Sequence, residues 1–324
     1  MLPMMKRRQF LTTSALTLAL PAWAADSARK PLRFGVITDV HQDIMHDGIA
    51  RITAFVTAMQ EAKVDFIIQL GDFCVPHARN QAFIDAWNRF EGPRYHVLGN
   101  HDTDGGYKKE ATRAFWGMPS NYYGFDQGGI RFLVLDGNDP GGKSRGYARF
   151  IGKEQQEWLR QELKNAVTPV IVCSHQPLES AGGVENQEEI RALLGSAPEQ
   201  GRRKIIACLS GHMHQDYVRI IHGIPHVQCN SASYVWLEGA KKAEVYPAAV
   251  HQAHPHLTRV APYRDPLWAV VTIDHQTSTM KLQGTKTEWV GEDPWQRGVT
   301  ETQYPRDIQR PAISDRSVVW NAKM

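Results

Sequence analysis

The stretch KIIACLSGHMH, residues 204–214, places two histidines directly after a short apolar run. Short runs rich in Ile and Val are typical of strands that are buried on both faces. Gly211 follows this run, and His212 and His214 come next. A His-x-His pair alone is weak evidence for a metal site, because exposed histidines are common. Whether this pair binds a metal therefore depends on whether other strands supply further ligands.

Runs of the same kind recur earlier in the chain, and helical patterns lie between them. The runs are LRFGVIT (32–38), DFIIQLGD (65–72), YHVLGN (95–100), RFLVLD (131–136) and PVIVCSH (169–175). Apolar residues with helical spacing predict helices over residues 48–62, 79–90, 108–116 and 153–165. Alternating strands and helices predict an α/β fold with a largely parallel sheet.

The pattern changes after about residue 217, where one strand-like run follows another. These runs are YVRIIH (217–222), PHVQC (225–229), LWAVVTI (267–273) and TMKLQ (279–283). They favour antiparallel pairing, so we expect a mixed or doubled sheet. Residues 240–266 read as an irregular insertion with four prolines, and long insertions often form functional lids. We place one catalytic domain at 30–290 and a surface-packed tail at 291–324.

Polar side chains stand where the strand-like runs end. In sheets of this type, ligands bind beyond the carboxyl ends of the strands. One polar residue there is unremarkable, because Asp is a common turn former. Five places that each supply a carboxylate, a carboxamide or an imidazole are hard to attribute to chance. The residues are Asp39, His41, Asp72, Asn100, His101, Asp102, His175, His212 and His214.

The chemistry of these side chains indicates two metal ions. Imidazole, carboxylate and carboxamide groups suit divalent Mn, Zn or Fe without any thiolate. Four imidazoles, two carboxylates and one amide are more ligands than one ion usually takes. Two ions about 3.5–4 Å apart, bridged by one carboxylate, would use them all.

Read in order, the motifs resemble those of the calcineurin-like metallophosphoesterases. The chain has D-x-H at 39–41, G-D at 71–72, G-N-H-D at 99–102, the lone His175 and G-H-x-H at 211–214. The resemblance covers about half of the chain, and the motifs together are highly specific. It implies a four-layer α/β/β/α sandwich with mixed sheets.

The resemblance also implies a role for each residue. Asp39, His41, Asp72 and His214 would hold one ion, and Asp72, Asn100, His175 and His212 would hold the other. Asp72 would bridge the two ions together with a water or hydroxide that attacks phosphorus in line. His101 would act as the acid and Asp102 would orient it. A non-catalytic scaffold with the same fold remains an alternative from a different class.

Two features bear on the substrate. Val75 stands where purple acid phosphatases carry a tyrosine, and the D-x-H motif looks more like that of cyclic-nucleotide phosphodiesterases. Residues 117–139 and 211–227 are similar to manganese-dependent ADP-ribose/CDP-alcohol diphosphatases. These resemblances imply a small phosphodiester or pyrophosphate substrate, with a phosphomonoester as the alternative. Further residues with open roles are His77, Tyr122, Tyr123, Asn138, His251, His254 and His256.

Four cysteines are present, and Cys173 and Cys208 lie inside apolar runs. Cysteine in such a run commonly behaves as a small buried hydrophobe, so we expect free thiols rather than a disulfide framework.

The first residues predict export from the cytoplasm. A basic start with Lys6, Arg7 and Arg8 precedes an apolar run from Phe10 to Leu20 and the small-residue site at 22–24. This is the form of an export signal, here of the twin-arginine type, and it is too short to be a comfortable membrane span. The formal charge is +3, and the signal holds three basic residues and no acid, so the mature chain is neutral. That balance gives no support for a nucleic-acid partner.

We expect a periplasmic or secreted protein that is cleaved near Ala24, because the small-residue site ends there. Cell fractionation and N-terminal sequencing of the mature protein test this. A protein found only in the cytoplasm with Met1 intact would contradict it.

Overall fold

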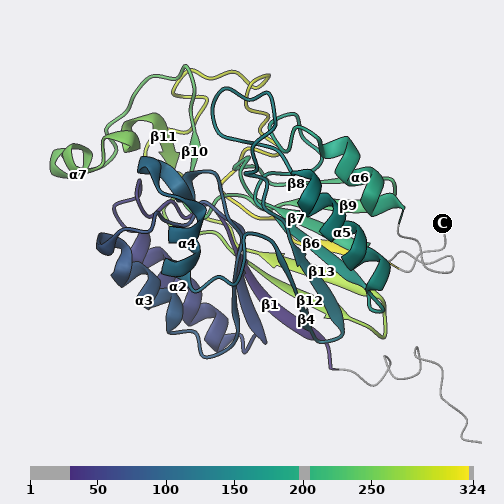
Figure 1. Cartoon of the computed structure of the whole chain (residues 1–324). Helices are drawn as coiled ribbons and strands as arrows, with labels where there is room; N and C mark the ends of the chain where they lie inside the picture. The colour runs from purple at the N-terminus through teal and green to yellow at the C-terminus, as the bar shows by residue number, and fades with distance from the viewer. Residues whose placement is uncertain (1–29, 197–204, 321–324) are drawn as a thin grey trace, which may run out of the picture.

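The computed structural model describes residues 30–196 and 205–320. The predicted export signal therefore lies outside the described residues. Two six-stranded mixed sheets form the centre of the molecule, with helices on their outer faces (Figure 1). This arrangement confirms the predicted α/β sandwich.

The first sheet has the strand order β14-β13-β12-β1-β2-β3. Strand β1 pairs in parallel with β2, and β2 pairs in parallel with β3, whereas β12, β13 and β14 join the sheet antiparallel. The strands are β1 (Leu32–Ile37), β2 (Phe66–Gln69), β3 (Arg94–His96), β12 (Ala269–Asp274), β13 (Thr279–Gly284) and β14 (Arg316–Val319).

The second sheet has the order β4-β5-β6-β7-β9-β8, and its four central strands are parallel. The strands are β4 (Tyr123–Gln127), β5 (Ile130–Val134), β6 (Val170–Ser174), β7 (Ile205–Ser210), β8 (Tyr217–Ile221) and β9 (Ile224–Gln228). A separate two-stranded sheet consists of β10 (Tyr234–Trp236) and β11 (Val260–Pro262). The expected mixing of parallel and antiparallel pairs is therefore confirmed.

The helices lie where the sequence predicts them, with four additions. Predicted helices correspond to α2 (Gly48–Glu61), α3 (Gln81–Asn88), α4 (Lys109–Trp116) and α5 (Lys153–Asn165), and the 3₁₀ turn η1 (Ala78–Asn80) precedes α3. The additions are α6 (Gln187–Gly195), α7 (Ala248–Ala253) and two further 3₁₀ turns, η2 (His101–Gly106) and η3 (Pro255–Arg259). None of the described helices combines the length and apolar character needed to span a bilayer.

Aromatic contacts hold the two sheets together. Phe34 of β1 and Phe66 of β2 stack at 4.7 Å, and Phe132 of β5 meets both rings edge-on from the other sheet at 5.4 and 5.3 Å. These three side chains are fully buried. A second apolar cluster joins Leu159 of α5 and Ile190 of α6 to the outer face of the second sheet. The four layers are thus tied by buried apolar contacts, which is the main stabilising term in a fold of this type.

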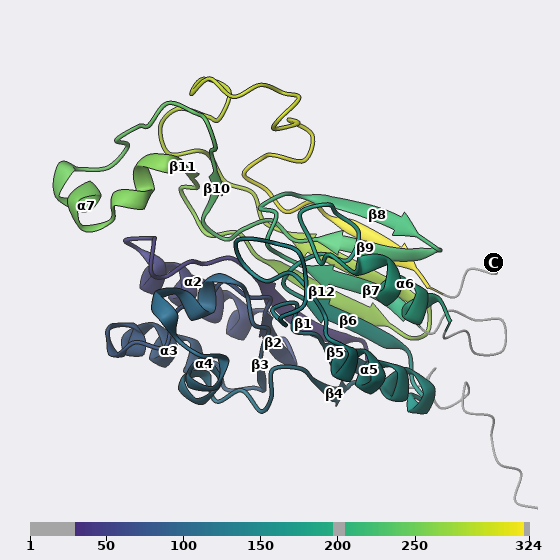
Figure 2. The ribbon, with the colours of Figure 1, turned by 45° about the horizontal axis from the view of Figure 1, so that its top comes forward.

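Two differences from the sequence prediction concern the last third of the chain. The insertion at 240–266 is partly regular, because it holds α7, η3 and β11, and it projects beyond the sheets at one end of the molecule (Figure 2). Residues 291–320 do more than cover the surface, since β14 completes the edge of the first sheet and Arg297, Gln309 and Trp320 are buried. The four cysteines are buried and free, as predicted.

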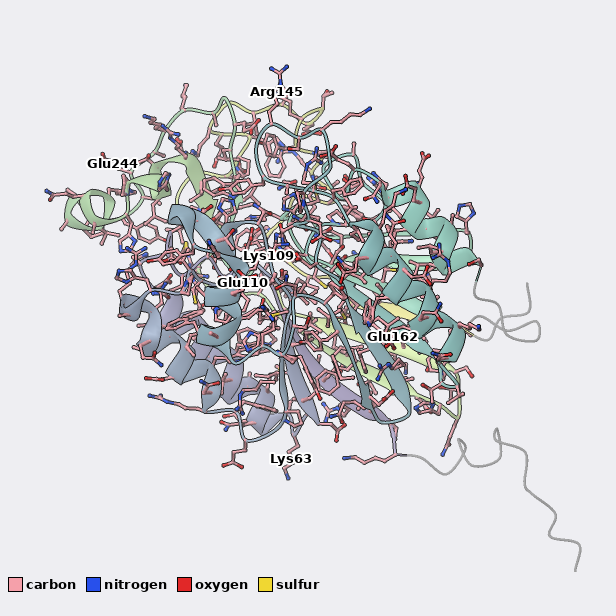
Figure 3. All side chains as sticks on the ribbon, viewed as in Figure 1. Lys63, Lys109, Glu110, Arg145, Glu162 and Glu244 are labelled. Carbon is pink, nitrogen blue, oxygen red and sulfur yellow. The ribbon has the colours of Figure 1, made fainter. Side chains whose placement is uncertain are left out.

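Figure 3 marks the two ends of the molecule. Arg145 and Glu244 project from the loop 137–150 and from the insertion at the end where the parallel strands finish, and Lys63 projects from the opposite end. Because parallel strands of both sheets finish at one end, the polar residues that follow them come together there.

Candidate metal centre

The predicted ligands converge into two groups of three at the carboxyl ends of β1, β2, β6 and β7. Asp39, His41 and His214 form one group, and Asp72, His175 and His212 form the other, with the potential ligand atoms of each group within 4.8 Å of one another. All of them except His212 are buried. Asn100, the remaining predicted ligand, lies beside the second group, with its Oδ1 atom 3.2 Å from His175 Nε2.

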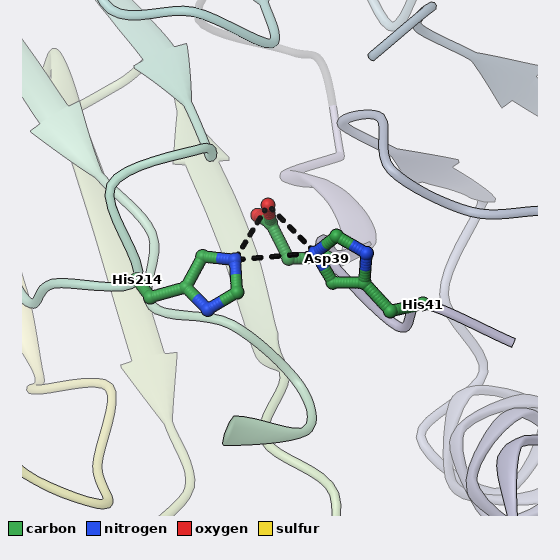
Figure 4. A group of neighbouring side chains, drawn as sticks. All are labelled: Asp39, His41 and His214. Carbon is green, nitrogen blue, oxygen red and sulfur yellow. Dashed lines mark hydrogen bonds and ion pairs between the residues drawn. The ribbon is translucent and has the colours of Figure 1, made fainter. Parts of the chain in front are cut away.

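Figure 4 shows how the first group is built. His41 Nε2 and His214 Nε2 face each other at 3.3 Å, and Asp39 Oδ1 lies 3.2 Å from the His214 nitrogen and 3.9 Å from the His41 nitrogen. Two imidazole nitrogens and a carboxylate oxygen thus point at one small volume. That donor set suits a divalent Mn, Zn or Fe ion.

Asp72 belongs to the second group and also reaches the first. Its Oδ2 atom is 3.1 Å from His175 Nε2 in the second group and 3.6 Å from His41 Nε2 in the first. Burial alone would raise the pKa of Asp72, but the neighbouring imidazoles, His175 first, hold it well below its usual value. The carboxylate is therefore charged and reaches both groups, which is the geometry of a bridging ligand.

The histidine rings are held by their other nitrogens. His175 Nδ1 donates to Leu70 O at 2.9 Å, His214 Nδ1 donates to Tyr234 O at 2.7 Å, and His212 Nε2 donates to Gly182 O at 3.2 Å. Metal-binding histidines commonly donate their second N–H to a backbone carbonyl in this way, which leaves the first nitrogen deprotonated for the ion. The buried His212 Nδ1 has no hydrogen-bond partner in the described part of the chain. These residues therefore fit a metal ion.

The backbone at the ligands is strained. Eight non-glycine residues in the described ranges have a positive φ, and five of them are predicted ligands: Asp39 (53°), His41 (51°), Asp72 (52°), His212 (75°) and His214 (50°). A positive φ is uncommon outside glycine and costs about 1 kcal/mol or more per residue. Strain that collects at one place in this way is a mark of a functional site.

Glycines next to the ligands leave room for close packing. Gly71 has a φ of +99°, a backbone conformation that favours glycine. Gly99 and Gly211 are different, because their φ values are not positive and their role is space. A Cβ at Gly99 would overlap the backbone nitrogen and carboxylate of Asp72, and one at Gly211 would overlap Thr38 and the Asp39 carboxylate.

His101 lies beside the two groups and is not part of either. Its ring centroid is 5.1 Å from that of His41, and 23% of its side chain is exposed. His101 Nδ1 is 2.7 Å from Asp104 Oδ2. Burial alone would lower the pKa of His101, but Asp72 and Asp104 raise it to about 8. The ring is thus fixed by Nδ1, and the two carboxylates favour its protonated form.

The expected contact between Asp102 and His101 is corrected by the structure. Asp102 is buried and accepts hydrogen bonds from the backbone N–H groups of Gly99, Asp72 and Phe73 at 2.6–2.9 Å. In a 3₁₀ turn, side chains three residues apart lie on the same side, so Asp104 and not Asp102 meets His101. The sequence analysis missed this i, i+3 signal.

Tyr147 is a second residue that the sequence analysis missed. Its hydroxyl donates to Asp104 Oδ1 at 2.9 Å and lies 3.1 Å from His101 Nδ1. The two rings are 4.7 Å apart. No local pattern predicts this contact, because Tyr147 comes from the loop 137–150, far along the chain from His101.

The other residues with open roles have mostly structural contacts. His254 Nδ1 donates to Ile44 O at 3.1 Å and so ties the insertion to the loop after β1. Tyr123 donates to His96 O at 2.8 Å, and His77 accepts the N–H of Arg79 at 3.0 Å. Asn138 lies nearer the site, with its amide 3.3 Å from Leu98 O. Tyr122, His251 and His256 do not belong to either ligand group.

The C-terminal segment braces His214. Gln309 Nε2 donates to His214 O at 3.0 Å, and the Asp216 N–H donates to Ile308 O at 2.8 Å. The buried Asp216 carboxylate accepts hydrogen bonds from Arg310 at 2.9 Å and Arg316 at 2.6 Å. Residues 308–316 therefore hold the backbone on which His214 adopts its left-handed conformation.

We expect Gln309→Leu to lower the manganese affinity of the site formed by Asp39, His41 and His214 by about 10–100-fold. The reason is that the carbonyl of His214 loses the hydrogen bond that holds this ligand in place. Manganese titration of the metal-free protein by calorimetry measures this. Gln303→Leu is the matched control, since Gln303 is exposed and, among the described residues, bonds only to Thr300. Equal weakening of both sites, or of neither, would contradict a local brace.

Comparisons with known proteins agree with this geometry. The family model described as calcineurin-like phosphoesterase matches residues 32–216. A manganese-dependent ADP-ribose/CDP-alcohol diphosphatase of Arabidopsis thaliana is 26% identical over 278 residues, covering 64% of this chain and 88% of the relative. A 3',5'-cyclic-nucleotide phosphodiesterase of Nostoc is 22% identical over 279 residues, covering 79% and 97%.

Among solved structures, a dimetal phosphatase from Danio rerio superposes with a TM-score of 0.57 at 15% identity, covering 81% of this chain and 99% of that one. This likeness bears on the fold alone. The family model spans more than half of the chain, and the protein therefore belongs to the calcineurin-like phosphoesterase family.

Proposed function

We propose that the protein is a dinuclear metal-dependent hydrolase that cleaves a phosphodiester or pyrophosphate bond in a small, nucleotide-derived substrate. The observation that carries this proposal is the position of Asp72, whose Oδ2 atom lies 3.1 Å from His175 Nε2 and 3.6 Å from His41 Nε2. One carboxylate within reach of both donor groups is the arrangement that a two-metal hydrolase needs.

In this proposal, Asp39, His41, Asp72 and His214 hold one ion, and Asp72, Asn100, His175 and His212 hold the other. Two divalent ions supply Lewis-acid polarisation of the phosphoryl group and activation of water near neutral pH. The nitrogen and oxygen donor set suits Mn, Fe or Zn. The names of the two diphosphatase relatives favour manganese.

His101 is the proposed proton donor to the leaving oxygen. Its Nδ1 atom is engaged by Asp104, so its Nε2 atom is the one available to a substrate. Asp104 orients the ring, and Tyr147 holds Asp104 through a 2.9 Å hydrogen bond. A positioned acid of this kind matters most for a leaving group that departs poorly without a proton.

The choice of a diester or pyrophosphate over a monoester rests on relatives. The similar proteins from Arabidopsis thaliana and Oryza sativa are named diphosphatases, and that from Nostoc is named a cyclic-nucleotide phosphodiesterase. Each of these names describes a phosphorus that carries two ester or anhydride bonds. This common feature supports the proposed substrate class.

Hydrolysis of a substrate panel tests the proposal. Purified protein loaded with Mn, Fe or Zn is assayed with ADP-ribose, cyclic AMP, bis-p-nitrophenyl phosphate and p-nitrophenyl phosphate. We expect the highest kcat/KM on the first three, and loss of activity together with one or both ions in Asp72→Asn, because the shared ligand is weakened. A preference for the monoester would overturn the substrate class. Two tightly bound ions in Asp72→Asn would overturn the bridging role.

A second experiment separates proton transfer from metal binding. We expect His101→Ala to retain both ions, because its ring belongs to neither donor group, and to lose about 10²–10⁴-fold in kcat. The loss is largest for alkoxide leaving groups and smaller for p-nitrophenolate, which departs without a proton. His77→Ala is the control, because His77 caps η1 and belongs to neither donor group.

Metal analysis and kcat on both substrate types decide the role of His101. Loss of an ion from His101→Ala would make His101 a ligand. An equal loss of rate on alkoxide and p-nitrophenolate esters would make it an electrostatic clamp rather than an acid.

A further inference from the structure

Tyr234 forms one wall of the metal centre. It begins β10 and is fully buried. Its ring stacks on His41 with centroids 5.1 Å apart and planes at 28°, and it lies 5.1 Å from the ring of His214. Its carbonyl also accepts the hydrogen bond from His214 Nδ1. Two of the three residues in the first donor group thus rest against this one side chain.

The hydroxyl of Tyr234 is buried and has no hydrogen-bond partner among the described residues. Other buried tyrosines satisfy theirs: Tyr263 donates to Asn230 Oδ1 at 3.1 Å, and Tyr217 donates to Glu179 Oε1 at 2.8 Å. A buried polar group without a partner costs free energy and calls for a specific explanation. Packing on His41 does not supply one, because phenylalanine would pack as well without that cost.

The hydroxyl of Tyr234 can donate one hydrogen bond, as any phenol does. Its neighbours in the first donor group, His41 and His214, direct their Nε2 atoms toward Asp39 and each other. They offer the hydroxyl no acceptor.

Two of the buried polar atoms that lack partners in the described part of the chain, one on His212 and one on Tyr234, have opposite character. His212 Nδ1 presents a lone pair, which suits a cation, and the Tyr234 hydroxyl presents a proton, which suits an anion. A phosphoester bound to metal ions would bring anionic oxygens into the site that the Tyr234 ring borders. The two unmet requirements are thus those of a metal ion and of a phosphoryl group.

We propose that Tyr234 is a further catalytic residue, whose hydroxyl donates a hydrogen bond to a phosphoryl oxygen of the substrate beside Asp39, His41 and His214. This inference rests on the proposed phosphoesterase function and adds a neutral donor to it. A donor fixed by burial is already oriented before the substrate arrives, so it stabilises charge that develops on the phosphoryl oxygens without further reorganisation.

Tyr234→Phe tests the proposal with little disturbance, because it keeps the ring against His41 and removes only the hydroxyl. We expect both manganese ions to be retained, the melting temperature to be unchanged or higher, and kcat to fall by about 10²-fold. Affinity for inorganic phosphate, measured by calorimetry on the manganese-loaded protein, is expected to fall as well.

Tyr263→Phe is the matched control. Tyr263 is equally buried, but its hydroxyl is bonded to Asn230, so this variant is expected to lose stability and keep the wild-type kcat and phosphate affinity. Tyr234→Phe is therefore expected to lose activity and keep its stability, whereas Tyr263→Phe is expected to lose stability and keep its activity. A purely structural tyrosine at 234 would instead behave like Tyr263.

Three results would overturn the role of Tyr234: wild-type phosphate affinity in Tyr234→Phe, loss of a metal ion from it, or failure of the manganese-loaded wild type to bind phosphate. Failure of the proposed function has a different signature. In that case the wild type hydrolyses none of the panel, while phosphate still binds and binds more weakly to Tyr234→Phe.

Discussion

The rest of the site depends on the hydrogen bonds that the buried side chain of Asp102 accepts. It accepts hydrogen bonds from the backbone N–H groups of Gly99, Asp72 and Phe73, and so ties the segment after β3 to the segment after β2. Those bonds place Asp72 within reach of both donor groups while its backbone has a φ of 52°. Burial, and after it the nearby Asp72 charge, raises the pKa of Asp102 to about 8. A residue that reads as the partner of a catalytic histidine instead holds the proposed bridging ligand in place.

The sequence predicts the strands and most helices well because their signals are local. Apolar runs such as residues 205–210 are long enough to identify a buried strand, and α5 matches its predicted range. The misses depend on distant contacts. Strand β14 has only four residues and forms because it pairs with β13. Ile49 fits the helical apolar pattern of α2, but its side chain is 41% exposed. Tyr147 meets Asp104 across a loop, and no spacing rule connects them.

Residue types at the strand ends predict the donor atoms. They do not predict the contacts that hold those donor atoms in place. His214 is identified by the G-H-x-H motif, within the residues 32–216 that the family model matches. The side chain that holds its carbonyl, Gln309, comes from beyond that range. The same segment supplies Arg310 and Arg316 to the buried Asp216. A motif specifies which atoms can bind an ion, whereas the geometry of those atoms depends on parts of the chain that carry no motif.

Backbone strain and buried charge at the centre link metal binding to the stability of the fold. Five ligand positions have a left-handed backbone, and two carboxylates, Asp39 and Asp72, are buried beside each other. Burial alone would raise the pKa of Asp39, but His214 and His175 lower it to about 2, so the Asp39 carboxylate favours its charged form beside these imidazoles. Such charge is costly unless it is paired. A divalent ion that binds only the folded chain offsets that cost, and its binding free energy adds to the free energy of unfolding. The left-handed conformations and the unpaired His212 nitrogen each cost free energy in the folded chain. The binding free energy of an ion would offset that cost.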